Sequence, residues 1–254
     1  MNTILKLCAG ICPVIGLSMA AIAVETDTQG NMRSGDNAST AVSTQAQLVR
    51  YIPPSGSRPT PKTRVGKGCS RGVPGAASTT VTLLVPEHVA YTSQEQPTLY
   101  WHLSSTAPQS VVVTVTGLDD VQPLIEKALT GPHAAGIHYF RLRDYGARLT
   151  AGKIYRCSVQ VVEKLGEPSV SDPLATAFVE RKTGNKDIAQ AGQHNSTLDR
   201  AQRYAGSGLW LDALDALFGS EGSEGSDATL MQARKALLEQ VGLQGLAAQA
   251  VAPH

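Results

Sequence analysis

The sequence predicts a mainly β protein with a helical C-terminal tail. Seven short segments rich in Val, Ile, Thr and Tyr follow one another between residues 81 and 182, and Pro, Gly, Ser and Asp separate them. After residue 195 the spacing of apolar residues changes from two to three or four. Short strands without intervening helices indicate an immunoglobulin-like antiparallel β-sandwich, and the later spacing indicates an α-helical hairpin.

Residues 1–23 have the pattern of a secretory signal peptide. Lys6 is followed by an apolar stretch that is short for a membrane-spanning helix, and small residues stand at Ala21 and Ala23. We expect cleavage after Ala23, although an uncleaved anchor is the alternative. The mature chain would then begin at Val24 and be periplasmic or extracellular.

Two cysteines, Cys69 and Cys157, remain in the mature chain. In an oxidising compartment they form a disulfide, or else Cys157 is a buried free thiol and Cys69 is exposed. The sequence leaves both alternatives open because it does not give the distance between the two residues.

Residues 24–77 are expected to be a disordered, basic linker rich in Ser, Thr, Pro and Gly. Within it, residues 57–72 carry five basic residues and no acidic one: Arg58, Lys62, Arg64, Lys67 and Arg71. They indicate a solvated linker, or a weak contact with an anionic surface. Over the whole chain 22 basic residues nearly balance 21 acidic ones, and residues 57–72 have no interleaved aromatics. We therefore expect no nucleic-acid partner.

Residues 78–182 are expected to form the β-sandwich. Alternation of side chains along a strand places Leu99, Trp101 and Leu103 on one face and Tyr100 and His102 on the other. Because a buried position is the usual one for a tryptophan in such a run, Trp101 is interpreted as a core residue.

The segment from 148 to 162 contains a glycine in a turn and a tyrosine at the entry of a strand. This arrangement is typical of the tyrosine corner of immunoglobulin-like folds. Gly152 would permit the turn, while the hydroxyl of Tyr155 reaches back to an upstream carbonyl and its ring enters the core. We interpret Tyr155 as a structural residue and not as a binding or acid–base group.

A polar linker at residues 183–195 leads to a helical hairpin at residues 196–250. Trp210, Leu214 and Leu217 recur at the spacing of one helix face. The hairpin is similar to a single tetratricopeptide unit, which cannot bury its own apolar face. We therefore expect it to dock on the sandwich or on a partner, with Trp210 as its main anchor.

Between Arg64 and Ala250 the chain contains the motifs RVGKGCSRGVPG, VTLLVPE with QPTLYWHL, AGIHYFRL with LTAGKIYRCSVQV, and GLWLDALDAL. With these motifs the chain resembles domain of unknown function 928, a family of exported bacterial proteins common in cyanobacteria. Members of the family carry an aromatic residue where Cys157 stands, so the resemblance does not imply the disulfide. It implies export and the domain limits, and it assigns no activity.

The sequence contains no pattern that indicates catalysis, a metal or a cofactor. The six histidines never fall at a spacing that places two ligands on one face beside an acidic partner. Asp119, Asp120 and Asp144 are interpreted as turn residues with nothing basic fixed beside them. No nucleophile elbow or phosphate-binding loop occurs.

Two functions remain. The first is a non-catalytic interaction module that binds another envelope or secreted protein. The second is a carbohydrate-binding or carbohydrate-processing envelope protein that uses Trp101 or Tyr139 as a platform for a sugar ring. A platform needs an exposed ring, so the exposure of Tyr100 and Trp101 distinguishes the two functions.

Overall fold

A computed structural model gives the fold of the chain. It describes residues 49–56, 79–167, 169, 172–183, 196–219 and 228–247. All of them belong to one compact unit, Thr44–His254. None of the helices within these ranges is long and apolar enough to cross a membrane. The expected signal peptide, Cys69 and the five basic residues of the linker lie outside the described residues.

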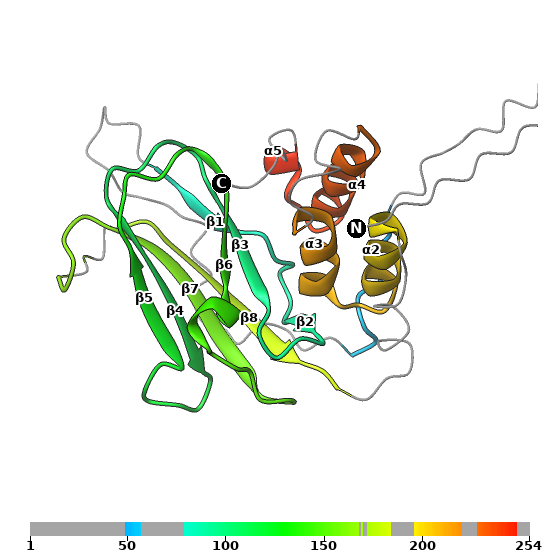
Figure 1. Cartoon of the computed structure of the whole chain (residues 1–254), viewed down its shortest axis with the longest axis horizontal. Helices are drawn as coiled ribbons and strands as arrows, with labels where there is room; N and C mark the ends of the chain where they lie inside the picture. Colours follow the sequence, from blue (N-terminus) through cyan, green and yellow to red (C-terminus); the bar gives the residue numbers. More distant parts are fainter. Residues whose placement is uncertain are drawn as a thin grey trace, which may run out of the picture. The chain divides into compact units, whose positions relative to one another are not determined.

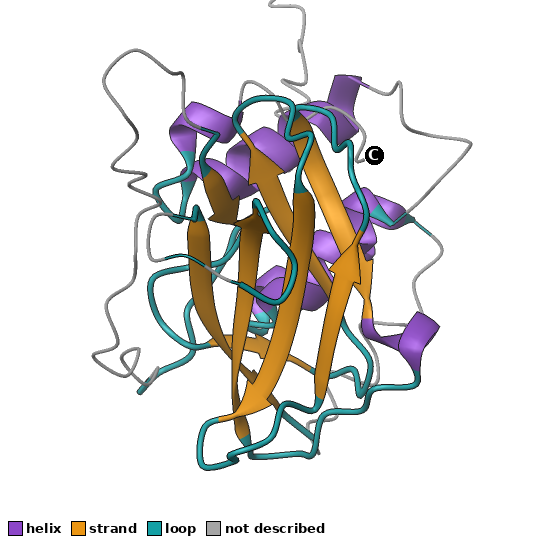
Figure 2. Ribbon diagram, turned by 90° about the vertical axis from the view of Figure 1, so that its left-hand side faces the viewer, coloured by secondary structure: helices purple, strands orange, loops and turns teal. Residues whose placement is uncertain are grey.

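The described β-structure consists of two sheets (Figures 1 and 2). The smaller sheet has the order β1-β3-β6, with β1 at Val81–Leu83, β3 at Thr98–Leu103 and β6 at Gly136–Arg141. The larger has the order β2-β8-β7-β4-β5, with β2 at Ala90–Thr92, β4 at Ser110–Gly117, β5 at Ile125–Leu129, β7 at Ile154–Val162 and β8 at Leu174–Arg181. The mainly β prediction is confirmed.

Strand β2 departs from the expected antiparallel arrangement. It pairs with β8 in parallel, with Ala90 opposite Val179, whereas the other strand pairs are antiparallel. The sequence predicts no strand at Ala90–Thr92, because three residues are too few for an alternating pattern.

The two sheets enclose an apolar core. In β4 the inward residues Val111, Val113 and Val115 are fully buried, and the residues between them are partly exposed. In β7 Cys157 and Val159 face the same core and are 1% and 0% exposed. These strands therefore follow the expected alternation, because one face of the larger sheet is wetter than the other.

The helices cover the outer face of the smaller sheet (Figure 1). They are α2 at Thr197–Gly206, α3 at Trp210–Phe218, α4 at Ala228–Glu239 and α5 at Gln244–Ala247, and a short 3-10 helix, η1, spans Leu142–Tyr145. Helix α3 packs on β2 and β3. All six residues of β3 are consequently buried, because the sheet core covers one face and the helices cover the other.

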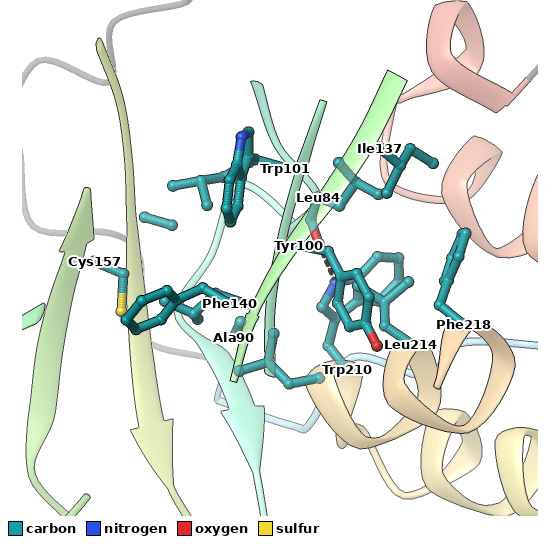
Figure 3. Packing of buried hydrophobic residues seen from close by; sticks show 14 of the residues in the cluster. Leu84, Ala90, Tyr100, Trp101, Ile137, Phe140, Cys157, Trp210, Leu214 and Phe218 are labelled. Atoms are coloured by element: carbon teal, nitrogen blue, oxygen red, sulfur yellow. Dashed lines mark hydrogen bonds between the residues drawn. The ribbon is translucent and has the colours of Figure 1, made fainter. Parts of the chain in front are cut away.

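Figure 3 shows the two faces of β3. Trp101 points toward the side of Cys157, while Tyr100 lies beside Trp210 and Phe218 on the helix side. The Trp210 indole nitrogen donates a hydrogen bond of 2.7 Å to the carbonyl of Leu84. The helical region thus docks on the sandwich, which is one of the two outcomes expected from its apolar face.

Residues 49–56 differ from the expected disordered linker. Val49 is 0% exposed and Tyr51 is 6% exposed. The backbone N–H of Ile52 donates to the carbonyl of Ala205 in α2 at 3.0 Å. This part of the linker is therefore packed against the helices.

Candidate functional site

The connection between β4 and β5 exposes three large apolar side chains. Leu118, Val121 and Leu124 are 42%, 98% and 38% exposed. Hydrogen bonds at the base hold the connection: Leu118 N–H donates to the carbonyl of Ile154 at 2.8 Å, and Leu124 N–H donates to that of Val115 at 2.8 Å. Residues 118–124, called the apolar tip below, therefore stand on a fixed base.

Gly117 allows the apolar tip to close. A Cβ atom at this position would lie 2.2 Å from Oδ2 of Asp120 and 2.5 Å from Cε of Lys153. These two side chains fold over the glycine, and the ammonium of Lys153 contacts both carboxylate oxygens of Asp120 at 2.7 Å. The expectation that nothing basic is fixed beside Asp120 was wrong, because its partner is 33 positions away in the sequence.

A hollow of about 580 Å³ lies beside the apolar tip. Its lining residues come from the tip and from the entry of β7: Asp119, Asp120, Val121, Gln122, Pro123, Leu124, Arg148, Thr150, Lys153 and Tyr155. Loops that a rigid sheet positions in this way commonly carry binding sites.

The charges around this hollow are largely paired. The hydrogen bond from Lys153 to Asp120 raises the pKa of the lysine. Arg148 contacts Glu95 at 2.7 Å, and this hydrogen bond lowers the pKa of the Glu95 carboxyl. Lys153 and Arg148 are thus paired with Asp120 and Glu95, whereas Val121 and Leu124 present exposed apolar surface at the hollow.

Tyr155 lies at the base of the same hollow and is 3% exposed. Its hydroxyl accepts a hydrogen bond of 2.9 Å from the backbone N–H of Thr150. Gly152, between them, has φ of +73°, which glycine adopts at little cost. The hydroxyl reaches upstream as expected, but its partner is an N–H group and not a carbonyl.

A second, polar hollow of about 260 Å³ lies between the helices and the β2–β3 and β6–β7 connections. It is lined by Gln94, Arg143, Arg200, Tyr204, Asp212, Asp215, Ala216 and Gly219. Asp212 is fully buried and accepts hydrogen bonds from the backbone N–H of Ser93, at 3.0 Å, and from its hydroxyl. Burial raises the pKa of Asp212, and the hydrogen bonds from Ser93 oppose this rise.

The second carboxylate of this hollow also has a structural partner. Asp215 accepts a hydrogen bond of 3.1 Å from the hydroxyl of Tyr100. Each of the two carboxylates thus fastens α3 to the β-structure, Asp212 through the β2–β3 connection and Asp215 through β3. Both contacts were missed by sequence reasoning because the partners are more than a hundred positions apart.

The histidines do not form a metal site within the described ranges. His133 and His138 pack edge to face with ring centroids 5.9 Å apart. Each ring donates from Nε2 to a carbonyl oxygen, that of Leu129 at 3.1 Å and that of Ala134 at 2.8 Å. No group of three or more His, Cys, Asp and Glu side chains in this part of the chain is placed to hold a metal ion.

The aromatic residues considered for a sugar platform are largely covered. Tyr100 and Trp101 are 2% and 1% exposed. Trp101 stacks on His138 at a centroid distance of 5.7 Å. Tyr139 is partly buried, and the guanidinium of Arg141 lies 4.3 Å from the centre of its ring.

Cys157 is buried within the core between the sheets. Because Cys69 lies outside the described residues, the Cys69–Cys157 disulfide stays a prediction. Trp210 is fully buried beside Leu214 and Leu217, as the helix-face pattern predicts.

The fold and site define a mainly β protein with C-terminal helices and an exposed apolar loop. The family model named Domain of Unknown Function (DUF928) matches residues 66–251, and the chain belongs to this family. The match confirms the resemblance found in the sequence. No curated protein matches the chain.

A solved engineered protein has weak similarity to the chain, with 16% identity and a TM-score of 0.29. The match covers 42% of this chain and 21% of the engineered protein. This TM-score is too low to support an argument about fold or function.

Proposed function

We propose that the protein is an exported, non-catalytic interaction module that binds an envelope or secreted protein at the apolar tip. The 98% exposure of Val121, which lies between the exposed Leu118 and Leu124, carries this proposal. Large apolar side chains gathered on one loop are characteristic of interaction surfaces, because a partner removes them from water.

We further propose that the sandwich is immunoglobulin-like and that residues 196–250 are a tetratricopeptide-like helical hairpin, in which α2 packs on α3. The strand order β1-β3-β6 corresponds to strands A, B and E of such a domain, and β5-β4-β7-β8 to C′, C, F and G. Tyr155 at the entry of β7 is then in the place of the corner tyrosine. By this assignment the apolar tip is the C–C′ loop, at the opposite end of the sandwich from the β7–β8 (F–G) connection.

Export rests on the pattern of residues 1–23. The mature protein is expected to begin at Val24 and to be periplasmic or extracellular. N-terminal sequencing of the protein from each cell fraction tests this expectation. A cytosolic protein that still begins at Met1 would contradict it, and would leave binding at the apolar tip to be decided separately.

A binding function agrees better with the site than carbohydrate processing does. The rings of Tyr100 and Trp101 are buried, so neither is available to stack on a sugar. A screen of the purified mature chain against glycan, peptide and ester substrates tests the absence of turnover. Activity that disappears in a variant of His102, His138, Asp144 or Glu163, with an unchanged melting temperature, would overturn the non-catalytic assignment.

Site-specific photo-crosslinking tests the apolar tip directly. A crosslinker at position 121 is expected to give one discrete adduct in the native envelope or secreted fraction. Leu165 is a matched control, because it is 54% exposed and lies in the β7–β8 connection at the other end of the larger sheet. Unlabelled wild-type protein should compete for the adduct, whereas Val121→Asp should not. Equal crosslinking from positions 121 and 165 would contradict the proposed site.

A further inference from the structure

Residues 49–54, called the strap below, lie against the helices as an extended segment (Figure 1, blue). The side-chain amide of Gln240, directly after α4, holds the strap backbone at two points. Its Oε1 accepts from the N–H of Tyr51 at 2.8 Å, and its Nε2 donates to the carbonyl of Val49 at 2.7 Å. A single side chain therefore satisfies both a donor and an acceptor of the strap, as a neighbouring β-strand would.

Helix α2 holds the other side of the strap backbone. The N–H of Arg50 donates to the side-chain oxygen of Gln202 at 3.1 Å, and the N–H of Ile52 donates to the carbonyl of Ala205 at 3.0 Å. These contacts use main-chain groups of the strap, so they do not depend on its side chains.

The strap side chains alternate between the groove and solvent. Val49 and Tyr51 are 0% and 6% exposed, whereas Arg50 is exposed and Ile52 is 51% exposed. This alternation is that of a bound extended peptide, in which every second side chain enters a pocket.

Tyr51 is the main anchor of the strap. Its ring packs edge to face on Trp210 at 4.9 Å and stacks on His88 at 5.9 Å. Nδ1 of His88 donates to the carbonyl of Val89 at 2.9 Å, which leaves Nε2 to accept from the Tyr51 hydroxyl at 3.2 Å. Burial accordingly raises the pKa of Tyr51. A buried aromatic ring with one specific hydrogen bond is typical of a binding hot spot.

Pro54 provides a third point of contact. A Cβ atom on Gly208, which has φ of +76°, would lie 2.4 Å from Cγ of Pro54. The glycine between α2 and α3 thus makes room for the proline. At the opposite end of the strap, a hollow of about 470 Å³ lined by Val49, Arg50, Ala236, Glu239 and Gln240 continues the groove.

We propose that this groove is a peptide-binding site for extended segments with the pattern apolar–x–Tyr–x–x–Pro, and that the strap is its intramolecular ligand. The partner is another protein that presents such a segment. The groove is distinct from the apolar tip, so this proposal goes beyond the proposed function and does not depend on it.

The length of the connecting chain supports an exchangeable ligand. Residues 57–78 separate the strap from the first strand, and a chain of this length spans up to roughly 75 Å when extended. A ligand tethered by such a connection has an effective concentration on the order of 1 mM. The strap therefore competes strongly with a free peptide, and a partner segment enters only when the strap is weakened or displaced.

Peptide binding to full-length variants tests the proposal. The probe is a labelled peptide of residues 49–56, VRYIPPSG, and the measurements are fluorescence anisotropy and melting temperature. Tyr51→Ala weakens the strap and should bind the peptide at least about 10-fold more tightly than the wild type does. Saturating peptide should also raise its melting temperature by about 5 °C and leave that of the wild type unchanged.

Matched controls make the result specific to the groove. Ile52→Ala alters a solvent-facing side chain of the strap, keeps the backbone N–H that contacts Ala205, and should behave as the wild type. Adding Gln240→Leu to Tyr51→Ala should abolish peptide binding, and so should replacing the tyrosine in the peptide with alanine. Folded Tyr51→Ala that binds no peptide at millimolar concentration, or that binds both peptides equally, would overturn the proposal.

A second measurement covers the case in which Tyr51→Ala does not fold. A protease site inserted between residues 57 and 78 allows the strap to be cut from the folded protein. The cut strap should then exchange with labelled peptide, which native mass spectrometry detects. A cut strap that stays bound without exchange would show that it is a fixed part of the fold, and crosslinking at position 121 would be unaffected.

Discussion

The indole nitrogen of Trp210 donates a hydrogen bond of 2.7 Å to the carbonyl oxygen of Leu84, although the two residues are 126 positions apart. Leu84 directly follows β1, and Trp210 begins α3. This bond therefore joins the first strand of the described sandwich to the centre of the helical region.

Replacing Trp210 with alanine should destabilise the protein by about 3 to 5 kcal/mol, because it removes a fully buried indole and leaves a cavity. Trp210→Phe keeps much of the ring and should lose less, chiefly the hydrogen bond to Leu84. Urea unfolding measures both effects, and limited proteolysis of residues 196–247 reports on helix docking. An unchanged proteolysis pattern for Trp210→Ala would show that docking does not depend on the indole.

Tyr155→Phe should reduce the free energy of unfolding by about 1 kcal/mol. The phenylalanine ring still fills the core, but the backbone N–H of Thr150 loses its acceptor. Binding at the apolar tip should survive this change. If the variant melts as the wild type does and yet loses its partner, then Tyr155 belongs to the binding site and its structural role is rejected.

Asp212→Asn should change the pH dependence of stability. Because burial raises the folded-state pKa above the ordinary 3.8, the protonated carboxyl is favoured in the folded protein. Its contribution to the free energy of unfolding is fully present below pH 3.8 and is lost as the pH rises through the folded-state pKa. Asparagine does not titrate. The free energy of unfolding of the wild type minus that of Asp212→Asn should therefore fall as the pH rises from 3.8 through the folded-state pKa.

Ser93→Ala provides the opposing variant for Asp212. It removes the hydroxyl that donates to the carboxylate, and this hydrogen bond lowers the pKa of Asp212. The loss of stability with rising pH should therefore extend to higher pH than in the wild type. Chemical denaturation across the acid range measures the three proteins together, and identical profiles would contradict the assignment.

Cys157 should resist alkylation in the native protein. Its side chain is 1% exposed, and burial raises the pKa of its thiol to about 12, so little thiolate is present near neutral pH. Mass spectrometry after iodoacetamide treatment measures the modification. Alkylation in denaturant, with and without a reductant, also decides whether Cys157 pairs with Cys69. Rapid alkylation of the native protein would contradict the buried position.

The sequence predicts which face of a strand is buried when the other face is polar. It does not predict the burial of both faces of one strand. In β4 the alternation of valine with polar residues is visible, because only one face meets the core. In β3 the same rule separates Tyr100 from Trp101, but it does not reveal that helices cover the Tyr100 side. That cover depends on contacts such as the one between Tyr100 and Asp215, which are 115 positions apart.

The ordered structure of the strap was not predicted, for a different reason. Only Val49 and Tyr51 are buried in it, and two alternating residues within a polar region do not make a recognisable pattern. Its order comes from contacts with Gln202 and Gln240, which are 152 and 189 positions away from their partners. Composition indicates how much apolar surface a segment can bury by itself. The strap is ordered instead by hydrogen bonds and packing that the helical region supplies.

The burial of both faces of β3 has a consequence for truncated and recombined forms of the chain. A chain shortened before residue 196 would present Tyr100 and the rest of that face to water, and such a surface promotes aggregation. Conversely, the helices alone would expose the Trp210 ring and leave its indole N–H without the carbonyl of Leu84. Exchanging the tail for an unrelated one would therefore expose this face unless the residues of β3 changed with it. We expect the residues on the two sides of this contact to change together.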